Sequence, residues 1–182
     1  HSGEFKFYTP NSGVRGSTGQ FRFETGNAKE GFSGGFEVIT GNSDHGQAGS
    51  IGLFAGLSSS KEKDKYVNGA DAAIHAGPTT SKHGTGGSLS LQAGTGYSDD
   101  RYDGGNGGSI HIVGGTAHGK NRAKDLGGDI VMKGGYSNHA TGGQINISTG
   151  FSPHNSSGNL IVGSEHAGII GNAGYGKLLW TD

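Results

Sequence analysis

The chain has 182 residues, of which 40 are glycine and none is cysteine, and its formal net charge is −1. This length suits one domain, and the near-neutral charge gives no electrostatic basis for binding nucleic acid. No apolar run is long enough to span a membrane, and the lack of cysteine excludes disulfides and thiolate chemistry.

The first element, residues 3–9, opens with Gly3, carries Phe5 and Phe7 two residues apart, and closes with Thr9. Apolar residues at a period of two predict a strand with one apolar face. The same segment is written ten times, and its first apolar position falls at Phe5, Phe21, Phe36, Ile51, Ala72, Leu89, Ile110, Ile130, Ile145 and Leu160. An imperfect eleventh copy lies at residues 176–180.

Two small residues frame each segment. An opening position lies two residues before the first apolar position, at Gly3, Gly19, Gly34, Gly49, Ala70, Gly87, Gly108, Gly128, Gly143 and Gly158. A closing position lies four residues after it, at Thr9, Thr25, Thr40, Ala55, Ala76, Ala93, Gly114, Gly134, Thr149 and Ser164. The second apolar position lies between them, two residues after the first.

Successive segments are 15 to 21 residues apart, and all the variation lies in the connectors between them. The longest connectors span residues 58–68, 97–106 and 116–126. Constant strands joined by variable connectors are typical of solenoid repeats, in which loops face solvent and strands face neighbouring units.

These observations predict an all-β fold, a single repeat domain over residues 1–182 with about ten to eleven strand units. We expect a β-solenoid of roughly 15-residue units, with two units per coil forming two parallel sheets that enclose one apolar core. The alternative is an antiparallel meander folded into a β-sandwich or barrel. Connectors of this length are long for hairpin loops, which favours the solenoid.

Six of the nine histidines lie in connectors: His45, His83, His118, His139, His154 and His166. One interpretation is that they are polar turn residues. The other is that coils in register stack them into a ladder of imidazoles that contacts mineral or anions and responds to pH. Their spacing lacks the paired ligands of a closed metal site, so we expect no bound metal and no other cofactor.

Both ends of the chain suggest self-association. The first strand begins almost at the N-terminus, with Phe5 and Phe7 exposed for contact, and Leu178, Leu179 and Trp180 lie near the C-terminus, where they would either cap the last coil or dock on another chain. Uncapped parallel solenoids expose unpaired backbone groups at their ends. We therefore expect a homo-oligomer or filament, with these five residues as the assembly surface.

The start at His1 suggests a processed, secreted chain, and the boundary of a fragment would account for it equally. No catalytic residues are predicted, and the chain is not expected to be an enzyme. Two other functions stay open. An adhesin or glycan-binding module would use exposed aromatic residues such as Tyr97, Tyr102 and Tyr136, and a copper enzyme would chelate the metal through the amine and ring of His1, as lytic polysaccharide monooxygenases do.

Residues 86–94 and 107–112, with their Gly-Gly-Ser start and alternating strand, carry a resemblance to known proteins. The pattern resembles the secreted glycine-rich strand repeats of marine organisms and is similar to biosilica axial-filament scaffolds of glass sponges. The resemblance implies an extracellular structural protein that self-assembles and organises a polysaccharide matrix or templates silica-type mineral. It implies neither nucleic-acid nor membrane partners.

Overall fold

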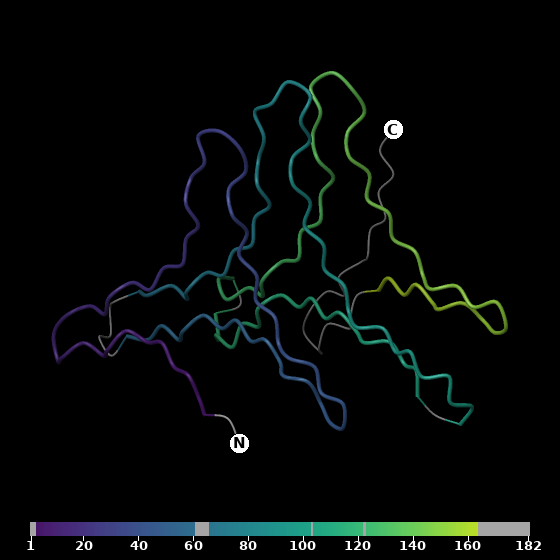
Figure 1. Ribbon diagram of the computed structural model, residues 1–182, viewed down its shortest axis with the longest axis horizontal. Helices are drawn as coiled ribbons and strands as arrows, with labels where there is room; N and C mark the ends of the chain where they lie inside the picture. The colour runs from purple at the N-terminus through teal and green to yellow at the C-terminus, as the bar shows by residue number, and fades with distance from the viewer. Residues whose placement is uncertain (1–2, 61–65, 103, 122, 164–182) are drawn as a thin grey trace. The chain divides into compact units, whose positions relative to one another are not determined.

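The computed structural model describes residues 3–60, 66–102, 104–121 and 123–163 (Figure 1). Within these ranges the chain forms no α-helix and no β-strand, and its non-helical backbone is interrupted only by isolated bends and turns. The chain divides into two compact units, His1–Leu89 and Ser90–Asp182.

The predicted all-β architecture is therefore wrong. The described residues show neither the two parallel sheets of a β-solenoid nor the antiparallel sheets of the alternative sandwich or barrel. The repeat of segments and connectors is present in the sequence, but the described segments are not strands and do not join into a hydrogen-bonded ladder. What replaces the ladder, at five connectors, is a contact at one point, a single backbone hydrogen bond.

That point is a neck, where the opening position of one segment meets the closing end of the segment before it. At five necks the opening glycine donates its backbone N–H to the carbonyl oxygen of the residue after the closing position. These bonds are Gly87 to Gly77 (2.9 Å), Gly108 to Gly94 (2.9 Å), Gly128 to Gly115 (2.8 Å), Gly143 to Gly135 (2.8 Å) and Gly158 to Gly150 (3.0 Å). Each neck closes its connector into a narrow out-and-back loop (Figure 1).

Consecutive segments run in opposite directions at a neck. The opening Gly19 lies against the side chain of the closing Thr9, since a Cβ at Gly19 would be 3.9 Å from Thr9 Cγ2. Two residues further into both segments, the Phe7 and Phe21 rings are 6.2 Å apart between centroids. A step forward along one segment thus matches a step back along the next, as in the two arms of a hairpin.

The predicted apolar core is also absent, because none of the described residues is buried. Ile145, at the first apolar position of its segment, is 50% exposed, and Ile147, at the second, is 59% exposed. Ordering a glycine-rich backbone costs more conformational entropy than ordering any other, and apolar burial is the main contribution that offsets this cost. A half-covered row of side chains supplies too little burial to stabilise continuous strands.

Candidate functional site

Five phenylalanines of the first three segments form one continuous aromatic strip: Phe5, Phe7, Phe21, Phe23 and Phe36. Within a segment the rings meet edge to face, at 4.6 Å and 84° for Phe5 and Phe7 and at 4.7 Å and 89° for Phe21 and Phe23. Between segments they lie more nearly parallel, at 32° for Phe7 and Phe21 and at 27° for Phe23 and Phe36. Such geometries are favourable for aromatic pairs.

The strip remains open to solvent. Its ring-bearing residues are exposed by 81% at Phe5, 67% at Phe7, 53% at Phe21, 64% at Phe23 and 68% at Phe36. Phe5 and Phe7 were predicted to lie on an assembly surface, with Phe21 and Phe23 as a second aromatic pair, and assembly through them stays a prediction. The structure places these four rings and Phe36 in one strip. The sequence did not predict the antiparallel neck that brings Phe7 to Phe21.

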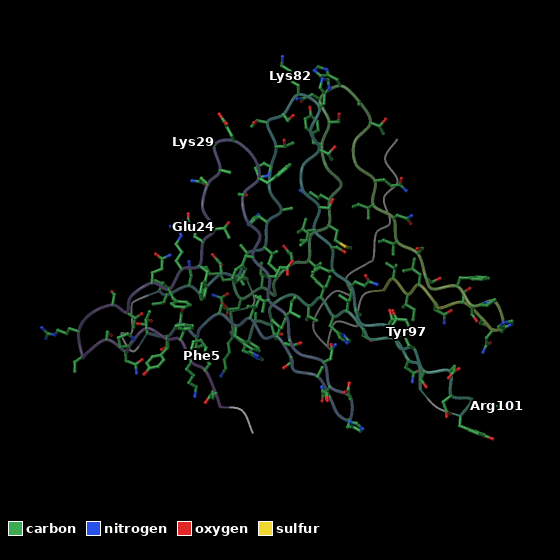
Figure 2. The ribbon with its side chains drawn as sticks, in the orientation of Figure 1. Phe5, Glu24, Lys29, Lys82, Tyr97 and Arg101 are labelled. Atoms are coloured by element: carbon green, nitrogen blue, oxygen red, sulfur yellow. The ribbon has the colours of Figure 1, made fainter. Side chains whose placement is uncertain are left out.

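The charged residues beside the strip pair within their own segments. Lys6 Nζ lies 2.9 Å from Glu4 Oε2, and Arg22 Nη2 lies 2.7 Å from Glu24 Oε2. Figure 2 labels Phe5 and Glu24, one from each of the first two segments. These exposed ion pairs contribute little stability. Each of the first two segments thus carries one acidic and one basic residue and has no net charge.

Loop tips are the second kind of exposed feature. The Lys29, Lys82 and Arg101 side chains project outward from the ends of their loops (Figure 2). At two tips a serine holds the turn. Ser137 Oγ accepts the Ala140 N–H at 3.1 Å, and Ser152 Oγ accepts the Asn155 N–H at 3.1 Å.

A histidine stands two residues after each of these serines, as part of a Gly-x-Ser-x-His sequence. The sequence occurs at residues 41–45, 135–139 and 150–154 and presents His45, His139 and His154, all of them exposed. Serine favours such turns because its hydroxyl replaces a backbone acceptor. The recurring serine was the signal that sequence reasoning, which followed only the histidine spacing, did not use.

The remaining connector histidines fall into two groups. His83 and His118 are exposed in their loops, whereas His166 lies outside the described residues. In the described part of the chain no three His, Cys, Asp or Glu side chains gather where they could hold a metal ion. The stacked ladder required coils in register, which the described residues do not form. Contact of these histidines with mineral or anions stays a prediction.

The other candidate residues are placed as follows. Leu178, Leu179, Trp180 and His1 lie outside the described residues. Tyr97, Tyr102 and Tyr136 are exposed by 90%, 93% and 88%, and no described ring contact joins them into a platform. Tyr97 and Tyr102 share one loop, where Asp100 Oδ1 accepts the Tyr102 N–H at 2.8 Å.

One open hollow of about 240 Å³ lies between residues 53–55 and 71–72. Its lining residues are Leu53, Phe54, Ala55, Asp71 and Ala72. Asp71 is the only titratable side chain among them. The hollow therefore does not bring together the acid–base pair that general acid–base catalysis employs.

Scans against known protein families, curated proteins and solved structures found no match to this chain. In the described residues, no helix is long and apolar enough to cross a membrane. The function is therefore inferred from the exposed residues of the chain.

Proposed function

We propose that this protein is a structural scaffold that acts as an ordered assembly of its own copies. The observation that supports the proposal is the exposure of the repeat's apolar positions along the whole described chain, from Phe5 at 81% to Val162 at 78%. Apolar side chains at fixed spacing are stabilised when a second surface removes them from water. Copies of the same repeat provide a surface with the same spacing.

The surface area of the chain points the same way. Its accessible surface is 19623 Å², whereas a folded monomer of this size exposes about 8,200 Å². Soluble monomers rarely present contiguous apolar patches above a few hundred Å² unless a partner covers them. Association of copies is the arrangement in which the two apolar positions of each segment contribute to stability.

The polar half of the proposal rests on the loop tips. Exposed serine, threonine and histidine side chains offer hydroxyl and imidazole groups that bind a hydrated surface by hydrogen bonds. The scaffold would thereby organise an extracellular matrix or template silica-type mineral along its loops. Location outside the cell is part of this proposal and was predicted from the sequence alone.

Sedimentation velocity over a range of concentrations, together with electron microscopy, tests the proposal. We expect large assemblies with a regular repeat, in the form of filaments or lattices. A chain that stays monomeric at high concentration would contradict the scaffold and favour the adhesin alternative. Retention on polysaccharide beads by that monomer would establish the alternative.

A further inference from the structure

We propose that the aromatic strip, residues Phe5, Phe7, Phe21, Phe23 and Phe36, is a self-complementary interface that joins two copies of the chain strip to strip. The inference rests on the proposed function, because it names the surface through which assembly begins. This interface differs from an end-to-end contact, in which the C-terminus of one chain would dock on the N-terminus of the next. In this arrangement the same residues of both copies meet across a two-fold axis.

The ring geometry favours an aromatic partner. Perpendicular pairs at 84° and 89° leave the strip with alternating ring faces and ring edges. Ring faces are negative and ring edges positive, so an identical strip turned by the two-fold axis can set edges against faces. All five rings are phenylalanine, without the polar hydroxyl or indole N–H that suits a wet, sugar-binding platform.

The exposed area is close to what a stable dimer needs. Each aromatic residue buries on the order of 150–250 Å², so the exposed fractions of the five phenylalanines leave roughly 650 Å² per copy. Complete coverage of both strips would remove at most about 1,300 Å² from water, at the lower end of the range of about 1,200–2,000 Å² for specific interfaces. The strip therefore suits a contact that begins assembly and that further segments reinforce.

Charge does not oppose this contact in the first two segments, which hold four of the five rings, whereas the third segment carries Glu37 and no basic residue. A two-fold interface places each surface against its own copy, so an unbalanced charge would repel itself. The ion pairs Lys6–Glu4 and Arg22–Glu24 balance the first two segments internally. Two identical strips can therefore approach without net repulsion from these segments.

Paired substitutions in the full chain test the strip. F7S/F21S removes two facing rings, at the second apolar position of one segment and the first of the next, which are 67% and 53% exposed. I112S/I130S is the matched control, because it changes the same two positions in a later pair of segments, where the side chains are 64% and 52% exposed. Light scattering and sedimentation equilibrium should show the dimer weakened about tenfold or more by F7S/F21S, whereas I112S/I130S should leave the dimer little changed and reduce only the larger assemblies. The strip would be ruled out as the interface if both variants weakened the dimer equally, or if F7S/F21S did not weaken it under conditions in which the wild type assembles. Neither result would rule out the proposed scaffold.

A second measurement leaves all five rings in place. The chain has no cysteine, so a single introduced thiol reports one position without background. Tyr8→Cys lies beside Phe7, and its matched control Val113→Cys lies beside Ile112. We expect a spin label on Tyr8→Cys to show one well-defined distance to its counterpart in the second copy, and a label on Val113→Cys to show a broad range of distances. Equally broad ranges at both positions would overturn the strip-to-strip contact, and a wild type that is monomeric throughout would overturn the proposed function as well.

Discussion

The backbone amide of Gly143 donates a 2.8 Å hydrogen bond to the carbonyl oxygen of Gly135, eight residues before it in the chain. A Cβ at Gly143 would lie 2.7 Å from the Gly135 nitrogen, closer than real Cβ contacts allow. The loop that presents His139 is closed by this contact. Glycine is needed at position 143 because the two backbones approach too closely there for any side chain.

Gly143→Ala is expected to open this neck. The added methyl group must push the Gly135 backbone away, which removes a hydrogen bond with a net contribution of about 1 kcal/mol. Amide hydrogen exchange at residue 143, followed by NMR, should become faster. Gly135→Ala is the matched control, because a Cβ there meets nothing within 4 Å. Equal exchange rates in the two variants would show that the close approach does not require glycine.

Ile145→Asp is expected to spare the monomer and weaken assembly. A sequence-based core would make this substitution prevent folding, but Ile145 is half exposed and the added carboxylate keeps its water. Sedimentation should show fewer large species, while the backbone chemical shifts of other segments stay unchanged. Asn146→Asp adds the same charge one residue away from the apolar positions and should assemble nearly as the wild type does. Loss of folding by Ile145→Asp would show that a core forms after all.

Asp125→Ala is expected to loosen the loop of residues 116–126. The Asp125 carboxylate accepts the Asn121 N–H at 2.7 Å, and the Asn121 carbonyl accepts the Asp125 N–H at 2.9 Å. Without the carboxylate the Asn121 N–H bonds to water, so its hydrogen exchange should become several-fold faster. A hydrogen bond to a charged group contributes about 1.5–3 kcal/mol when it is shielded from solvent, and this exposed bond contributes less. Asp125→Asn keeps an acceptor oxygen and should lie between Asp125→Ala and the wild type. An unchanged rate in Asp125→Ala would show that solvent already competes for the amide.

The tip histidines are expected to carry adsorption to mineral. His139 and His154 stand at loop tips, whereas His75 and His111 lie in the repeat segments. H139Q/H154Q should therefore bind silica particles more weakly than the wild type, and H75Q/H111Q should bind as the wild type does. Adsorption isotherms at one ionic strength measure both variants, since exposed charges are screened by salt. Equal adsorption by both variants would leave the tip histidines as turn residues.

Much of the local structure was predictable from residue types. Period-two spacing located Phe5 and Phe7 in one segment, and glycine marked the opening position at Gly143, where no side chain fits. The turn at residues 137–140 follows from serine chemistry alone. These features depend on neighbours within a few residues along the chain.

The fold class was not predictable in the same way. Apolar alternation at Ile145 and Ile147 shows that one face of a segment is apolar, but it does not show what covers that face. The sequence by itself determined the repeat, its connectors and the residues that frame each segment. Only the tertiary structure decided that neighbouring segments meet antiparallel at single necks, without a ladder or a core in the described residues, because strand pairing is a balance between non-local burial and backbone entropy.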